Sequence, residues 1–253
     1  MRQGKYFFVL FILLFVVNLY SYQDNLIGLV TPAQLNNWEA EVSIQHRFRG
    51  AFDEEPLDTF FGMNRGANVA LFYRQAFIRK LELKLGYIKD NNEYTADASW
   101  CFTPPEFPVQ AQTNLEYFSY QDFINPEERH KNFLFLLAVQ NKPLYDRLIL
   151  NTNLGYDTEE ERFVSGFGAG VKILQNLTYL FEYYPVWDRD SATGNLQFLI
   201  RKYDCFSTGI KLDTYGHHFM FVLGTNEGMT LRQSTMGSYL KDLKFGFNVQ
   251  RHL

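Results

Sequence analysis

The sequence predicts an all-β protein, a transmembrane up-and-down antiparallel β-barrel of about 12 strands that follows an N-terminal signal peptide. Three observations lead to this prediction. The chain opens with a short basic and apolar leader, and apolar and polar residues then alternate over most of its length. The connections between the alternating segments also differ in length according to their order in the chain.

The leader has the two parts of a secretory signal. Arg2 and Lys5 supply positive charge, and an apolar run follows from Tyr6 to Val17. The run is shorter than the ~20 residues of a membrane-spanning helix. The sequence therefore predicts a signal peptide over residues 1–22 and one barrel domain over residues 23–253, with an N-terminal membrane anchor as the alternative. A chain of 253 residues suits a single β domain.

Alternation with a period of two marks the predicted strands. In the first strand, Val42 and Ile44 alternate with Glu41, Ser43 and Gln45. Most segments of this kind approach the ~9–11 residues that a tilted membrane strand needs. The predicted strands cover residues 37–48, 67–76, 79–88, 92–101, 108–120, 132–141, 145–156, 163–174, 177–187, 203–213, 217–224 and 242–252.

The connections between these strands predict the orientation of the barrel. The longest cover residues 50–66, 121–131, 187–202 and 225–241, and the tightest cover residues 77–78, 175–176 and 213–216. If the first strand runs outward, every long connection lies outside, as in bacterial outer-membrane barrels. We therefore expect the outer membrane of a Gram-negative cell, with both termini in the periplasm. In a soluble β-sandwich, the alternative fold, there is no reason for the long connections to lie at one end and the short ones at the other.

The two faces of the strands differ in chemistry. In a membrane barrel the apolar face contacts lipid, and the polar face lines the lumen. The charged residues on the predicted lumen face are Glu39, Glu41, Arg47, Arg74, Glu82, Lys84, Asp97, Glu116, Lys172, Glu182, Lys211 and Lys244. Because both signs of charge occur, we expect ion pairs that narrow the lumen; a conducting passage is the alternative.

Glycines and cysteines on the same face give two smaller predictions. Gly166, Gly168 and Gly170 share the lumen face of one strand and leave room for a bulky neighbour or a bend. They lack the spacing and the following helix of a nucleotide-binding loop. Cys101 and Cys205 fall at opposite ends of the barrel, so we expect free thiols.

No combination of residues predicts an enzyme, a cofactor or a metal site. His46 lies on the apolar face near the outer end of the first strand, where some outer-membrane phospholipases carry a Ser-His-Asn set. No serine stands beside it, so we interpret it as an interfacial histidine. The net charge of −4 makes a nucleic-acid partner unexpected.

Several stretches resemble one family, the membrane-bound β-barrel domain of unknown function 5777. They are residues 25–32, 41–48, 60–73, 223–230 and 245–251. The resemblance implies an outer-membrane barrel and implies no activity. The last strand also resembles the C-terminal signal read by the outer-membrane assembly machinery, although Leu253 replaces the usual aromatic residue. We therefore expect the lipid bilayer and this machinery as partners, and a small solute as cargo.

The sequence thus predicts an outer-membrane barrel without an assigned activity. We expect a narrow or loop-gated pore, or a barrel with a structural role in the envelope. The alternatives are an outer-membrane lipid hydrolase or protease, and a barrel that binds an apolar ligand in a cavity lined by Phe72, Phe118 and Leu180.

Overall fold

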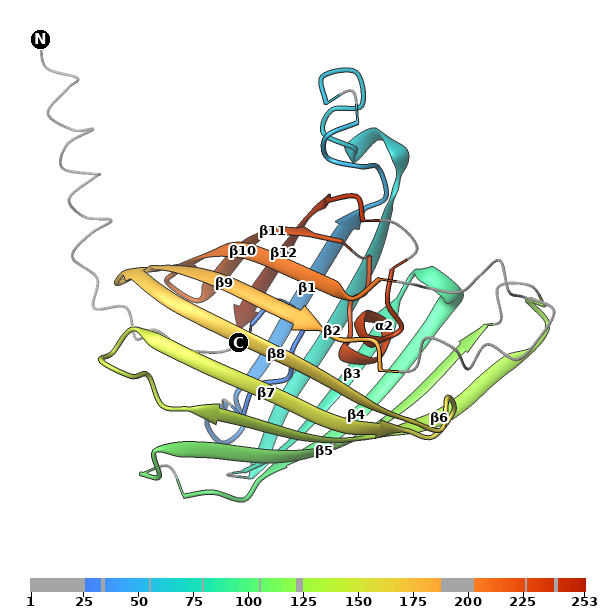
Figure 1. Cartoon of the computed structure of the whole chain (residues 1–253). Helices are drawn as coiled ribbons and strands as arrows, with labels where there is room; N and C mark the ends of the chain where they lie inside the picture. The colour runs from blue at the N-terminus through green and yellow to red at the C-terminus, as the bar shows by residue number, and fades with distance from the viewer. Residues whose placement is uncertain are drawn as a thin grey trace, which may run out of the picture.

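The structure, a computed structural model, is a closed antiparallel β-barrel (Figure 1). It describes residues 26–32, 35–54, 56–78, 80–104, 106–121, 125–187, 203–225, 227–238 and 241–253. The predicted signal peptide, residues 1–22, lies outside the described residues. Each strand pairs with its neighbour in the sequence, and β1 pairs with β12 to close the barrel. The predicted fold class and strand order are therefore confirmed.

The strands follow the predicted segments closely. Their bounds are β1 Ala40–Phe48, β2 Ala67–Ile78, β3 Leu81–Ile88, β4 Glu93–Cys101, β5 Val109–Gln121, β6 Arg129–Asn141, β7 Leu148–Asp157, β8 Arg162–Leu174, β9 Leu177–Tyr184, β10 Cys205–Thr214, β11 His217–Gly224 and β12 Lys244–His252. The largest differences occur at the starts of β1, β6 and β7 and at the end of β9; β1, for example, was predicted from residue 37. Trp38 has a positive φ of 69° and lies in a turn, so extended pairing begins only at Ala40.

Helices contribute little to the described residues. They are the 3₁₀ turns η1 Met63–Arg65 and η2 Asp90–Asn92, and the short helix α2 Leu231–Thr235. None of the described helices has the length and apolar character to cross a membrane.

The two ends of the barrel differ. At one end, hereafter the turn end, short connections such as residues 175–176 and 215–216 join the strands. At the other, the loop end, lie the long connections 49–66 and 225–243; Figure 1 shows the first projecting beyond the strands. The predicted parity of connection lengths is therefore present, and the chain ends at the turn end beside Ala40.

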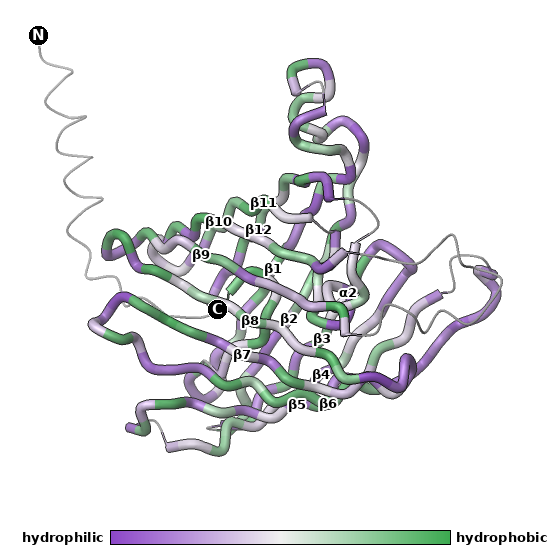
Figure 2. The backbone as a smooth tube through the Cα atoms, in the orientation of Figure 1, coloured by the Kyte–Doolittle hydropathy of each residue, from purple (hydrophilic) through white to green (hydrophobic). Residues whose placement is uncertain are grey.

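The outward face of the strands is apolar. Alternating hydrophobic and hydrophilic residues are visible along the strands in Figure 2. Large exposed apolar side chains from different strands include Leu71, Leu85, Leu115, Phe135, Leu154, Phe181, Ile210 and Phe221. A continuous band of this kind is what a lipid-facing surface requires.

The lumen contains two segments that are not strands. We call residues 26–32 and 35 the inner strap, because they precede β1 and lie inside the barrel. We call residues 227–238, which contain α2, the lid, because they reach the lumen from the loop end (Figure 1). Leu26 and Leu29 of the strap and Leu231 of the lid share one buried cluster with side chains from the barrel wall.

Candidate functional site

The inner strap is held by hydrogen bonds to its main chain. The N–H of Gly28 donates to both carboxylate oxygens of Glu182 at 3.1 and 2.9 Å, and the N–H of Leu29 donates to the same carboxylate at 3.1 Å. Tyr184 donates its hydroxyl to Glu182 as well. A fully buried carboxylate thus receives three donors, which offset the loss of its hydration.

Amide side chains hold the rest of the strap. The N–H of Val30 donates to Asn153 Oδ1 at 2.8 Å, and the carbonyl of Val30 accepts from Asn153 Nδ2 at 2.8 Å. The carbonyl of Ile27 accepts from Asn248 at 3.0 Å, and the N–H of Leu35 donates to Glu82 at 2.7 Å. Side chains of the lumen wall therefore bind the backbone N–H and C=O groups of the strap. A sheet edge binds a peptide through the same groups, but with its own backbone.

Glycines of β8 make room for the strap. A Cβ on Gly166 would overlap the side chain of Leu29, and one on Gly168 would overlap Leu26. The expected bulky neighbour of these glycines is therefore the strap itself. Phe118 and Leu180, predicted as the lining of an apolar ligand cavity, are buried in the same cluster as Leu26 and Leu29. This part of the lumen is filled by the chain's own leucines.

The lid is held by one buried ion pair. Arg232 Nη2 lies 2.8 Å from Glu93 Oε2, and both side chains are almost completely buried. The guanidinium also lies over the rings of Phe118 and Tyr120, at 4.2 and 4.8 Å from their centroids. Gln233 Nε2 donates to the same Glu93 oxygen at 3.0 Å. Charge pairing, cation–π contact and hydrogen bonding thus act on α2 together.

A second carboxylate supports the lid from the rim. Glu159, in the connection after β7, accepts from the Tyr120 hydroxyl at 2.9 Å and lies 2.9 Å from His130 Nδ1. Its other oxygen lies 3.9 Å from Arg232. Burial raises the pKa of the Glu159 carboxyl above its ordinary value, against the opposing effect of these partners.

A cavity of about 80 Å³ remains between the two plugging segments and the barrel wall. Its wall side is polar, and the strap and lid contribute apolar residues such as Leu29 and Met229. Thr31 of the strap and Thr230 of the lid are polar, but most of the polar lining comes from strands β1 to β5 and from β12, through Glu41, Ser43, Gln45, Arg74, Glu82, Lys84, Asp97, Ser99, Gln112, Asn114, Glu116 and Gln250. The unfilled part of the lumen is therefore its charged part.

Ion pairs cross this charged wall. Arg74 lies 3.3 Å from Glu41 and 3.4 Å from Glu82, so one guanidinium joins β1, β2 and β3. The ammonium of Lys84 lies over the Phe72 ring, 5.1 Å from its centroid. Asn114 donates to both oxygens of Asp97 at 3.2 Å. Pairing and space thus coexist on this side of the lumen.

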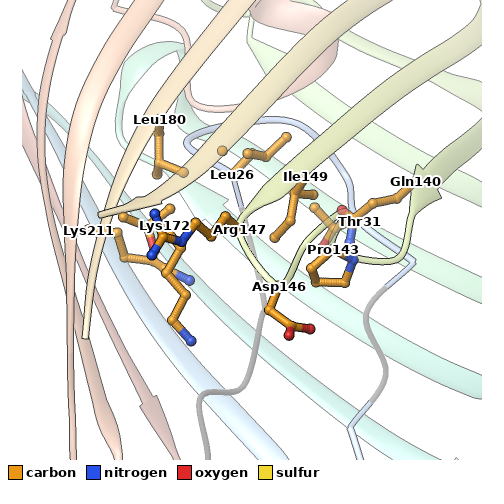
Figure 3. Close-up of a pocket in the computed structure, with 12 residues that line it drawn as sticks. Leu26, Thr31, Gln140, Pro143, Asp146, Arg147, Ile149, Lys172, Leu180 and Lys211 are labelled. Carbon is orange, nitrogen blue, oxygen red and sulfur yellow. The ribbon is translucent and has the colours of Figure 1, made fainter. Parts of the chain in front are cut away.

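A smaller pocket of about 20 Å³ lies at the turn end (Figure 3). Leu26 and Thr31 of the strap border it, and the cationic side chains of Arg147, Lys172 and Lys211 gather around it. Because both ends of residues 26–31 border this pocket while Gly28 binds Glu182 nearer the loop end, the strap enters the lumen and turns back.

The structure places the charged residues predicted on the lumen face as follows. Buried side chains are Glu41, Arg47, Arg74, Glu82, Asp97, Glu116, Glu182 and Lys211, and partly buried ones are Lys84, Lys172 and Lys244. Glu39 differs, because it precedes β1 and its carboxylate accepts from the N–H and the side-chain amide of Asn36 at 2.8 Å. It closes the turn before the first strand instead of lining the cavity.

Two further residues complete the comparison with the sequence. His46 lies on the outward face and stacks on the Phe247 ring, with 5.0 Å between ring centroids. Within the described part of the chain, its Nδ1 has no hydrogen-bond partner. Cys101 and Cys205 form no disulfide, as predicted, and both are buried.

Sequence reasoning missed the strap and the lid as occupants of the lumen. The strap is too short and too irregular to show a periodic pattern of apolar and polar residues. The lid did offer a signal, because Thr230 and Gln233 have the spacing of a helix capping box. The Thr230 side chain accepts from the Gln233 N–H at 3.3 Å.

Comparison with known families identifies the C-terminal half of the chain. Residues 130–253 match the family described as membrane bound beta barrel domain (DUF5777). The resemblance predicted from the sequence is therefore confirmed, and the match includes the stretches 223–230 and 245–251. The comparison with curated proteins found no match.

Solved structures of similar fold are outer-membrane barrels. A KdgM porin in complex with disordered oligogalacturonate has a TM-score of 0.52 at 9% identity, covering 83% of this chain and 98% of the porin. An active-site mutant of outer membrane phospholipase A from Escherichia coli has a TM-score of 0.50 at 11% identity, covering 91% of this chain and 95% of the phospholipase. At these identities the likeness shows the fold alone: this protein is a membrane β-barrel built like outer-membrane proteins.

Proposed function

We propose that this barrel is a gated pore of the outer membrane for small polar solutes, closed by the inner strap and the lid. The observation that supports a pore is the cavity of about 80 Å³ along the charged wall, which two non-strand segments border. A barrel with a purely structural role has no need of buried charges beside unfilled space, because such charges are costly to bury.

The means of closure support gating. The strap contributes no strand to the barrel, and its removal leaves the ladder from β1 to β12 intact. Its contacts are hydrogen bonds to wall side chains, among them Glu182, Asn153, Asn248 and Glu82, together with apolar contacts of Leu26, Ile27 and Leu29. A segment held in this way can leave the lumen without unfolding the barrel.

The orientation follows from the connections. We place the turn end in the periplasm and the loop end outside, as bacterial barrels arrange short turns and long loops. In this orientation the strap closes the periplasmic side and the lid closes the outer side. Labelling of a Leu57→Cys variant on intact cells tests it, since residue 57 is 85% exposed in the loop-end connection 49–66. An impermeant reagent should label it, and failure to label it in folded protein contradicts the orientation.

Conductance tests the pore. In planar bilayers the parent barrel should show small or rare steps. A variant in which residues 26–35 are replaced by a glycine–serine linker of equal length should show steps several-fold larger, because the linker lacks the leucines that fill the lumen. A folded, inserted variant that stays silent refutes the pore and leaves a structural role for the barrel.

A further inference from the structure

The lumen cavity has an excess of negative charge. Among the described residues, four carboxylates, Glu41, Glu82, Asp97 and Glu116, line it together with two cationic side chains, Arg74 and Lys84. Arg74 is engaged by Glu41 and Glu82 at 3.3 and 3.4 Å. Lys84 stands opposite Asp97 in the register between β3 and β4, and Asp97 stands opposite Glu116 in the register between β4 and β5. One partly buried ammonium thus serves two buried carboxylates, which leaves room for a second cation.

Two buried amides give an independent sign of a missing ligand. Gln45 and Gln250 line the same cavity and are only 8% and 3% exposed. Within the described residues, the Oε1 atom of each has no hydrogen-bond partner. A buried acceptor without a donor is uncommon and costly, at about 1–3 kcal/mol. Gln250 stands opposite Ser43 in the register between β12 and β1, so these acceptors lie on the side of the cavity away from β4 and β5.

The rest of the lining indicates the shape of the ligand. The strap and lid present Leu29, Val30 and Met229 to the cavity, and Phe72 of β2 joins them. Lys84 already illustrates the fit, because its ammonium lies over the Phe72 ring and its residue stands opposite Asp97 in the register between β3 and β4. A space of about 80 Å³ holds several water molecules, since one water needs roughly 10–15 Å³ on the same measure.

We infer that this cavity binds a small organic cation, an ammonium group with N–H donors on a short aliphatic body. Asp97 and Glu116 bind the charge, Gln45 and Gln250 accept hydrogen bonds, and the apolar residues of the strap and lid contact the aliphatic part. This site deepens the proposed function, because it names the class of solute that the pore selects. An inorganic cation would satisfy the carboxylates but would leave the apolar lining in contact with water.

Calorimetric titration of the full barrel in detergent tests this site. The probe is n-butylammonium chloride, and sodium butyrate and potassium chloride are titrated under the same conditions. The parent should bind one butylammonium per barrel and should not bind butyrate. Asp97→Asn and Glu116→Gln should each weaken binding about tenfold, the effect of one charged hydrogen bond. Asp213→Asn, a buried lumen carboxylate outside this cavity, should leave binding unchanged.

The outcomes separate this inference from the pore. If the parent and Glu116→Gln bind butylammonium equally, the signal comes from partition into detergent and the site is overturned. If potassium binds as tightly as butylammonium, the site does not select an organic cation. Folding of each variant is checked by its heat-dependent migration in gels. If a carboxylate variant fails to fold, Gln250→Met is tested in its place. This substitution removes an Oε1 atom that has no hydrogen-bond partner among the described residues. If the strap-replaced variant conducts but the parent does not bind butylammonium, the pore stands and the site is overturned. If the parent binds butylammonium but the strap-replaced variant does not conduct, the site stands and the pore is overturned.

Discussion

The lumen has two unlike walls, and each holds a different plugging segment. The wall formed by β7 to β9 presents asparagines, glycines and Glu182, and it binds the strap through the strap's backbone. The wall formed by β1 to β5 presents charges, and it binds the lid through Glu93 and the rings of Phe118 and Tyr120. The first wall borders a pocket of about 20 Å³, whereas the second borders a cavity of about 80 Å³.

The comparison teaches that alternation describes a barrel but not its contents. Both walls have the same period of two, with an apolar outer face and a more polar inner face. What differs is the size and charge of the inward residues. Small glycines allow a peptide to pack closely, whereas long charged side chains hold one another apart and leave space between them.

The largest effect is expected at the lid. Arg232→Met should leave Glu93 buried without its cation, which costs about 3–5 kcal/mol in comparable cases. Because the lid can leave the lumen, this cost should appear as lid opening. A Ser234→Cys probe, buried in the parent at 3% exposure, should then react much faster with an impermeant maleimide in a background without Cys101 and Cys205.

A second substitution serves as the control for this prediction. Adding Glu93→Gln to Arg232→Met removes the uncompensated charge, so the double variant should recover part of the protection of the probe. If the probe reacts at the parent rate in Arg232→Met, the buried pair does not hold the lid, and the charged wall has no role in closure.

A smaller effect is expected on the strap wall. Gly166→Ala adds a methyl group that overlaps Leu29 and lies 3.0 Å from Leu231 and 3.2 Å from Tyr184, so strap, lid and wall are all crowded. Crowding of this kind typically costs about 1–3 kcal/mol. Conductance steps should become more frequent, because the strap is displaced from its glycines.

The matched control is Gly170, which lies further along β8 on the same face. A Cβ at Gly170 meets its nearest atom, on Leu180, at 3.4 Å, which is ordinary contact. Gly170→Ala should therefore behave like the parent in unfolding and in conductance. Equal behaviour of Gly166→Ala and Gly170→Ala would mean that the glycines do not position the strap.

The strands could be predicted because a membrane sheet obeys one local rule. Strand β11 has the bounds that alternation predicts, 217–224, since lipid and lumen act on every second residue. The contents of the lumen follow no such rule. The glycines of β8 predict a bulky neighbour, but only the folded barrel brings Leu26 and Leu29 from the start of the chain to them. Glu182 likewise gives no sign in the sequence that its partners are backbone amides.

The smallest effect is a pH dependence at the rim, where the lid meets Glu159. Burial raises the pKa of this carboxyl above its ordinary value of 4.5, so the folded protein binds the proton more tightly than the unfolded chain. Unfolding free energy should therefore fall as the pH rises upward from about 4.5, until Glu159 is ionised in the folded state. Denaturant unfolding across this range should show a shallower slope in Glu159→Gln. Glu160→Gln, at the exposed neighbouring position, should keep the parent's slope. A Glu159→Gln slope equal to that of the parent would assign the pH dependence to the strap wall or to the charged wall instead of the lid.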